Sequence, residues 1–242
     1  MSPKMFLFTV LVGYQLFSIA GAQMVISTLD PSRYPYIVRL RPSVTSTFTG
    51  VGLIVSSRFI LAQKTFSFSN IPATGIEITE QTGKIQFAAV KQSIVGDKYA
   101  YLKVCRKFNG ATYPMTSSRF SSLASDNPNT TMLFFNTTSP VLQEVSPFTV
   151  MSASNCTTFA WAPSSGELIC IYRNLTPGSC LFFTDDPRNY YQAPVLVING
   201  HPHGFLSGYS CSSDTITSTW YFYNFGYDRA ALIQEIPEVT IQ

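Results

Sequence analysis

Histidine is the side chain best suited to proton transfer near neutral pH, and this sequence contains only two, His201 and His203. Their alternate spacing could place both imidazole rings on one side of a strand, where they could ligate a metal. Two ligands without a neighbouring cysteine or carboxylate make a weak metal site, and a hairpin turn at Asn199-Gly200 explains the spacing better. We therefore expect no metal site, and no histidine can serve as a base from the first half of the chain.

Carboxylates and thiols offer little more chemistry. The pair Asp185-Asp186 is interpreted as a solvated loop tip rather than as a catalytic dyad or a calcium site. Cys105 has no histidine near it that could activate the thiol. We interpret it as a buried or half-buried free thiol, with an interchain disulfide as the alternative. No glycine-rich phosphate loop is present, and no cofactor is expected.

Three segments resemble known sequence motifs, and in each one key residue is replaced. From Gly50 the chain reads GVGLIVSSRFILAQKT. This segment resembles GGSLISxxWVLTAAHC, a motif of the trypsin-like serine proteases, and the resemblance puts Lys64 at the catalytic histidine. KYAYLKV resembles DIALLKL and puts Lys98 at the catalytic acid, while NYYQAPVL resembles GDSGGPLV and puts Tyr191 at the nucleophilic serine. The triad works as a unit, so its loss implies a fall in kcat of roughly 10⁶-fold.

The resemblance also covers the specificity pocket. It aligns Gly178 with the floor position that carries a specificity-setting charge, so the cation anchor of a trypsin is missing. It aligns Ser207 and Tyr209 with the pocket rim and Trp220 with a small glycine on the opposite wall. We expect the tyrosine and the tryptophan to fill the slot, so that benzamidine-like ligands do not bind.

The composition indicates strands. Hydrophobic residues make up 45% of the 242 residues and charged residues only 12%, which favours half-buried strands over amphipathic helices, and this length suits one large all-β domain. The resemblance implies an all-β fold of two Greek-key antiparallel β-barrels of the trypsin-like type with a C-terminal α-helix. The implied peptidase S1-like domain spans 23–242, with barrel one at about 23–115, a crossover at about 116–130, and barrel two with the closing helix at about 131–242.

Short apolar runs between turn residues predict the individual strands. An amphipathic segment at 227–236 predicts the closing helix. The predicted strands are 36–40, 50–55, 59–62, 84–90 and 99–104 in the first barrel, and 131–135, 148–151, 168–172, 193–199, 204–207 and 218–224 in the second.

The first 22 residues are typical of a secretory signal peptide. Lys4 precedes an apolar run from Met5 to Ala20, and Ala20-Gly21-Ala22 is a small-residue cleavage site. An uncleaved anchor is the alternative, but the run is shorter than the ~20 residues that a membrane span needs. We expect a secreted, extracellular protein with no membrane attachment after removal of the signal.

Export makes disulfides and glycans relevant. The resemblance implies two bridges, Cys156–Cys170 and Cys180–Cys211, and leaves Cys105 as the odd one of five cysteines. Four asparagines are followed two residues later by threonine and are predicted glycosylation sites. These are Asn129, Asn136, Asn155 and Asn174.

The chain looks like the noncatalytic serine protease homologues common in insects, which act as cofactors, decoys or carriers in haemolymph or reproductive secretions. That resemblance implies a secreted, catalytically inactive pseudoprotease with a binding, cofactor or regulatory role. Two alternatives stay open: a structural or matrix component linked through Cys105, and an enzyme with residual serine-type endopeptidase or rebuilt chemistry.

The partner is expected to be an extracellular protein of unknown identity. The formal net charge is +3, and no basic run interleaved with aromatics occurs, so nucleic acid is not an expected partner. Aromatic side chains at a cleft rim are a common source of binding energy. We expect Phe182, Phe183 and Tyr190, on the loop after Cys180, to form part of the interface.

Overall fold

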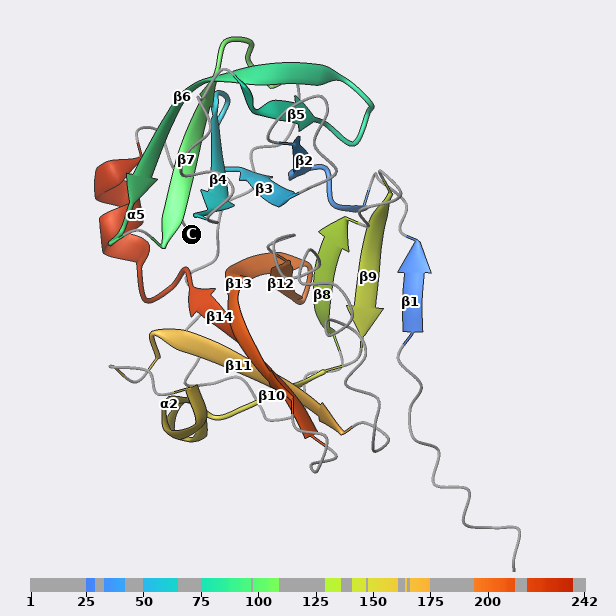
Figure 1. The fold of residues 1–242 in the computed structure, drawn as a ribbon, viewed down its shortest axis with the longest axis vertical. Helices are drawn as coiled ribbons and strands as arrows, with labels where there is room; N and C mark the ends of the chain where they lie inside the picture. The colour runs from blue at the N-terminus through green and yellow to red at the C-terminus, as the bar shows by residue number, and fades with distance from the viewer. Residues whose placement is uncertain are drawn as a thin grey trace, which may run out of the picture.

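The computed structural model describes residues 25–28, 33–41, 50–64, 75–96, 98–108, 129–135, 141–146, 148–160, 164, 166–174, 194–211 and 217–236. Strands dominate this part of the chain, and two β units are stacked one above the other (Figure 1). The predicted all-β class with a C-terminal helix is confirmed.

The first unit is a closed antiparallel barrel in the order β2-β3-β4-β7-β6-β5. Because β5, β6 and β7 follow one another and β4 lies beside β7, the connectivity is a Greek key. A Cβ atom on Gly52 would lie 2.7 Å from Cγ2 of Ile60, so the tight barrel interior requires glycine there. The strands are β2 (Ile37–Arg41), β3 (Gly50–Ile54), β4 (Phe59–Gln63), β5 (Glu77–Thr79), β6 (Ile85–Ile94) and β7 (Tyr99–Val104).

The second unit is a curled antiparallel sheet in the order β1-β9-β8-β12-β13-β14-β11-β10. Its apolar side chains form a core of their own that includes Met132, Val145 and Phe222. The strands are β1 (Val25–Thr28), β8 (Thr130–Phe135), β9 (Leu142–Ser146), β10 (Thr149–Val150), β11 (Leu168–Asn174), β12 (Val195–Ile198), β13 (His201–Cys211) and β14 (Thr217–Asn224).

A separate apolar cluster lies between the two units and joins them. It combines Leu53 and Tyr99 of the barrel with Leu133 and Phe205 of the sheet, and Leu232 of the terminal helix adds to it. All five side chains are buried. Burial of this much apolar surface is the main force that holds the two units together.

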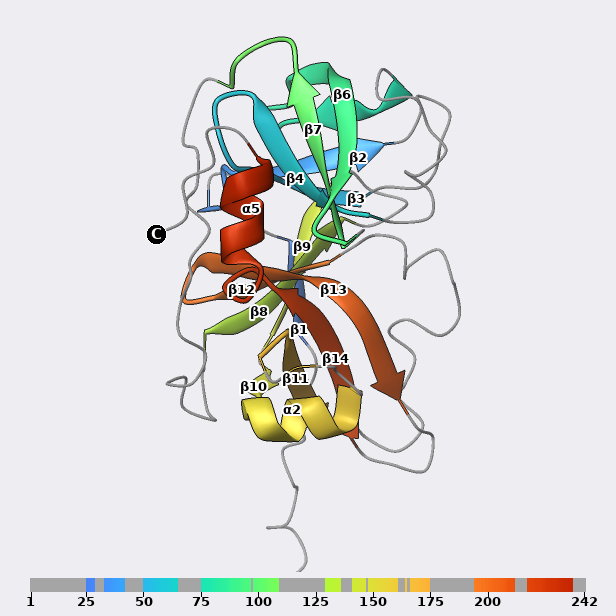
Figure 2. The same cartoon turned by 90° about the vertical axis from the view of Figure 1, so that its left-hand side faces the viewer.

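Two helices are described. Helix α5 (Arg229–Glu235) follows the second sheet and packs on the first barrel beside the β6–β7 turn (Figure 2). Helix α2 (Ala153–Ala160) was not predicted; it carries Cys156, whose disulfide to Cys170 on β11 confirms the expected bridge. By loop closure, a bridge of this span contributes about 3 kcal/mol.

The observed strands differ from the predicted ones mainly at the edges. Val25–Thr28 falls within the range given to the first barrel, but it pairs with β9 at the edge of the second sheet. Strands β5 and β9 were not predicted, since Glu77 and Glu144 interrupt the apolar pattern and are both buried. Their ion-pair partners are Arg41 on β2 and Arg33 before β2, which lie far away in the sequence, so a local pattern does not reveal them.

Candidate functional site

The positions that align with the catalytic histidine and acid lie next to each other. Lys64 follows β4, Lys98 precedes β7, and the backbone N–H of Lys64 donates to the carbonyl of Lys98 at 3.1 Å. The neighbouring pair Gln63–Tyr99 continues the ladder between these strands. The barrel therefore brings the two predicted positions together, and each carries a lysine.

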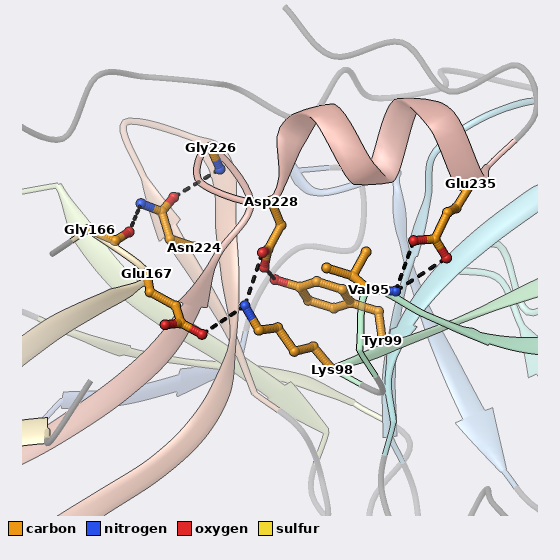
Figure 3. A network of polar contacts seen from close by, with 9 residues as sticks. All are labelled: Val95, Lys98, Tyr99, Gly166, Glu167, Asn224, Gly226, Asp228 and Glu235. Atoms are coloured by element: carbon orange, nitrogen blue, oxygen red, sulfur yellow. Dashed lines mark hydrogen bonds and ion pairs between the residues drawn. The ribbon is translucent and has the colours of Figure 1, made fainter. Parts of the chain in front are cut away.

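The ammonium group of Lys98 is held by two carboxylates. Its Nζ atom lies 3.0 Å from Oδ1 of Asp228 and 3.0 Å from Oε1 of Glu167 (Figure 3). The rings of Tyr223 and Tyr227 each lie 5.6 Å from the same atom, within cation–π distance. Burial opposes the charge, but the hydrogen bonds and the charges of the two carboxylates outweigh it and raise the pKa of Lys98. The lysine therefore stays protonated and is not a base near neutral pH.

Asp228 connects this cation to the terminal helix. It is 5% exposed and precedes the first residue of α5, yet its carboxylate makes no capping bond to the helix. Instead Oδ2 accepts from the Tyr99 hydroxyl at 2.7 Å. Burial, followed by the charge of Asp228 and this hydrogen bond, raises the pKa of Tyr99 well above its usual value, so the phenol remains a donor.

Further contacts extend the network on both sides. Glu235, at the end of α5, accepts from the backbone N–H of Val95 at 3.3 Å. The Asn224 amide donates to the carbonyl of Gly166 at 2.7 Å and accepts from the N–H of Gly226 at 2.9 Å. Figure 3 shows these contacts as one group that ties the first barrel, the second sheet and α5 together. The arrangement holds elements in place and offers no nucleophile–base pair.

Sequence reasoning missed Asp228 and Glu167 as partners of Lys98, and Tyr99 as a partner of Asp228. Aspartate before a helix predicts an N-cap, which would have marked Asp228, although for a different role. The two carboxylates lie far from Lys98 in the sequence, Asp228 by 130 residues, and no local motif links them.

The two aromatic residues that align with the pocket rim and its opposite wall, Tyr209 and Trp220, differ in how deeply they are buried. Tyr209 on β13 pairs with Trp220 on β14 and is half-buried. Trp220 is 2% exposed and lies in the core of the second sheet, where its ring meets Phe148 edge to face at 5.1 Å. Because Gly178 lies outside the described residues, closure of the pocket by Trp220 stays a prediction.

The β13 strand, which carries Ser207 and Tyr209, reaches beyond its neighbour. Strand β12 pairs with β13 as far as Phe205, whereas β14 pairs with it as far as Cys211. Several predicted residues lie outside the described part of the chain, as does the predicted Cys180–Cys211 bridge. They are Tyr191, Phe182, Phe183, Tyr190, Asn136 and Asp185-Asp186.

The histidines occupy the predicted hairpin. Asn199 and Gly200 have φ values of 52° and 81°, and Ile198 pairs with His201 across the turn, the geometry of a two-residue hairpin. His203 is 4% exposed, and burial, with a smaller effect of His201, lowers its pKa to about 4. Within the described residues, no three metal-ligating side chains come together.

Three of the remaining predicted residues, Asn129, Asn155 and Cys105, are exposed. Asn129 lies before β8 and Asn155 on α2, while Asn174 ends β11. The prediction that Cys105 is buried or half-buried is wrong, because its thiol is exposed. The chain leaves the barrel wall after β7, so a side chain at this position faces solvent.

No family model matches the sequence, and no curated protein matches it. Solved structures do match in fold. The VesB protease of Vibrio cholerae has a TM-score of 0.62 at 16% identity over 85% of this chain and 65% of VesB. The secreted serine protease VesC of the same organism has a TM-score of 0.63 at 14% identity over 84% of this chain and 46% of VesC.

An inactivated relative shows the same likeness. The scabies mite inactivated protease paralogue S-I1 has a TM-score of 0.58 at 14% identity over 87% of this chain and 99% of that one. These likenesses confirm the trypsin-like double-barrel fold. Proteases and an inactivated paralogue share it, so the fold leaves catalysis to be argued from the site.

Proposed function

We propose that this chain is a secreted, catalytically inactive homologue of trypsin-like serine proteases that acts by binding an extracellular protein. The observation that carries the proposal is the binding of Lys98 by Asp228 and Glu167. In a working triad, an acid at this position orients and stabilises a histidine. Here a protonated lysine occupies it beside a second lysine, Lys64.

The substitution at Lys98 is compensated by its surroundings. A lysine placed alone in a partly buried site would lose hydration without gaining a partner. Carboxylates from β14–α5 and from the start of β11 supply those partners. Restoring aspartate at this position would put a third carboxylate beside Asp228 and Glu167. The site is therefore built around a cation, which supports a long-standing noncatalytic role.

The binding role is proposed for the rim of the former cleft. There β13 extends past β12, and Tyr209 is half-buried. Extended peptides bind to many proteins by pairing with the exposed edge of a β-strand. The aromatic loop of Phe182, Phe183 and Tyr190 is proposed to supply the side-chain contacts.

Secretion is supported by several features. Residues 1–22 have the pattern of a signal peptide, and disulfides such as Cys156–Cys170 persist in oxidising compartments. VesC, which shares the fold, is a secreted protease.

Inactivity can be tested with a fluorophosphonate probe on the protein purified from culture medium, beside active trypsin as the control. We expect no labelling. Specific labelling of one residue, abolished by substituting it, would overturn the proposal. The binding role is tested by the proteins that co-purify with the chain, with Phe182→Ala/Phe183→Ala expected to weaken their capture without unfolding. If this double variant captures the same proteins equally well, the cleft is not the interaction surface.

The exposed thiol of Cys105 favours a second candidate, a matrix component held by an interchain disulfide. A non-reducing gel of the secreted protein separates the two. A disulfide-linked species that Cys105→Ser abolishes supports the second candidate, and a monomer under both conditions excludes it.

A further inference from the structure

We propose that the first barrel carries a second binding surface, which docks an acidic segment of a partner protein. The surface consists of Arg58, Phe87, Lys103, Arg106 and Lys107, and we call it the basic face. It is separate from the former cleft, and the proposal does not depend on what the cleft binds.

Backbone hydrogen bonds gather the four cations. Phe59 on β4 pairs with Lys103 on β7, and the N–H of Val104 donates to the carbonyl of Arg58 at 3.0 Å. The N–H of Phe108 then donates to the carbonyl of Ser57 at 2.9 Å. The segment between these bonds, residues 105–107, therefore folds across the β3–β4 turn and brings its two cations to Arg58.

These cations are accessible and uncompensated. Lys103, Arg106 and Lys107 are exposed, and Arg58 is half-exposed. Among the residues that the structure describes, none of the four side chains forms an ion pair or a hydrogen bond. Lys103 is positioned by an aromatic ring instead, since its Nζ atom lies 5.7 Å from the centre of Phe59.

Each described carboxylate is bound by a group outside the basic face. Glu77, which pairs across the strands with Phe87, is itself neutralised by Arg41. Cationic side chains bind five of the six carboxylates, and a backbone N–H binds the sixth. The pairs are Glu77 with Arg41, Glu80 with Lys84, Glu144 with Arg33, Glu167 and Asp228 with Lys98, and Glu235 with Val95. Among the described residues, cations without a bound carboxylate are thus gathered on the basic face, and such a surface attracts an acidic partner.

An exposed aromatic side chain decides which kind of acidic partner fits. Ala88 on β6 pairs with Val104 on β7, so Phe87 lies one residue away from this pair on the side of Cys105. Phe87 is 45% exposed, and Ile85, on the same outward face of β6, is 51% exposed. Protein interfaces combine arginine with a buried aromatic anchor. A sulfated polysaccharide would use the charges and leave the phenylalanine without a role.

The test uses the full-length secreted protein and a fluorescent synthetic peptide of glutamate and aspartate around a central Leu-Phe pair. Binding is followed by anisotropy. We expect Arg106→Gln and Phe87→Ser each to weaken binding by about tenfold. Two matched variants on helix α5 should bind like the wild type: Arg229→Gln removes another exposed arginine, and Ile233→Ser removes a side chain that is 46% exposed.

The outcomes separate this proposal from its rivals. No binding by the wild-type protein, or equal losses in the α5 variants, would overturn it. Loss with Arg106→Gln but not with Phe87→Ser, together with displacement of the peptide by a heparin fragment, would make the basic face a polysaccharide site instead. Phe182→Ala/Phe183→Ala should leave peptide binding unchanged, so failure of the cleft proposal is distinguishable from failure of this one.

Discussion

The ammonium of Lys98 lies 3.0 Å from the carboxylate of Asp228, so the residue before β7 is bound to the residue that precedes the terminal helix. Glu167 binds the same ammonium from the start of β11. Where a serine protease keeps an acid to hold a histidine, this chain keeps a cation that joins three elements. We propose that the position that aligns with the catalytic acid serves here as a structural contact.

The contact should be costly to break. Asp228→Asn keeps the size of the side chain but removes the charge that Lys98 and the Tyr99 hydroxyl face. We expect the free energy of unfolding to fall by about 2 kcal/mol, since the buried hydrogen bond from Tyr99 loses its charged acceptor and a partly buried cation is left with one carboxylate. Urea denaturation measures this. Glu235→Gln, an exposed site, serves as the control and should cost less than about 0.5 kcal/mol; equal effects would show that Asp228 has no special role.

Stability should decline in alkali because of the same group. The pKa values of Tyr99 and Lys98 are raised in the folded protein. Above about pH 10, the unfolded chain releases both protons while the folded chain retains them, so the unfolded state binds fewer protons and the free energy of unfolding falls as the pH rises. Tyr99→Phe removes one of the two groups. The free energy of unfolding of this variant, measured by urea denaturation, should therefore fall less steeply with pH than that of the wild type. Parallel declines would contradict the assignment.

Acid should destabilise the protein through His203. Its pKa falls to about 4 in the folded state, from an ordinary value of 6.5. Between these values the unfolded chain takes up a proton that the folded chain does not, so stability is lost as the pH falls through this window, by roughly 3 kcal/mol in total. His203→Gln should show a flatter pH dependence over the same range, measured as the midpoint of urea unfolding. An unchanged slope would place the titration elsewhere.

The buried Trp220 should matter for packing and not for hydrogen bonding. Its Nε1 atom has no partner among the described residues, while its ring packs against Phe148. Trp220→Ala should cost about 3 to 5 kcal/mol, and Trp220→Phe less than about 2 kcal/mol because most of the contact area remains. Thermal and urea unfolding of both variants provide the test. A large loss for phenylalanine would mean that the indole nitrogen has an essential partner.

The cysteines give a covalent test. Peptide mapping without reduction should recover Cys156–Cys170 and the predicted Cys180–Cys211 bridge, with Cys105 outside both. Replacing Cys156 and Cys170 with alanine should lower the free energy of unfolding by about 3 kcal/mol. Cys105→Ser, at an exposed thiol, should change it by less than about 0.5 kcal/mol. A peptide that links Cys105 to one of the other four would refute the framework.

Local features were readable from the sequence alone. The apolar runs predicted five of the six strands of the first barrel, all but β5. Asn199-Gly200 predicted the β12–β13 hairpin, because only a few residues adopt the positive φ values that this turn requires. The resemblance to the protease family correctly paired Cys156 with Cys170. Each of these rests on a pattern within one segment or on one aligned motif.

Long-range partnerships were decided by the tertiary structure. Three features depend on segments that lie far apart in the chain. They are the pairing of β1 with β9, the binding of Lys98 by Asp228 and Glu167, and the gathering of cations on the basic face. The sequence does not show whether a lysine side chain faces a carboxylate or water. Only the docking of barrel, sheet and helix determines which charges meet, because ion pairs depend on distance and burial rather than on order along the chain.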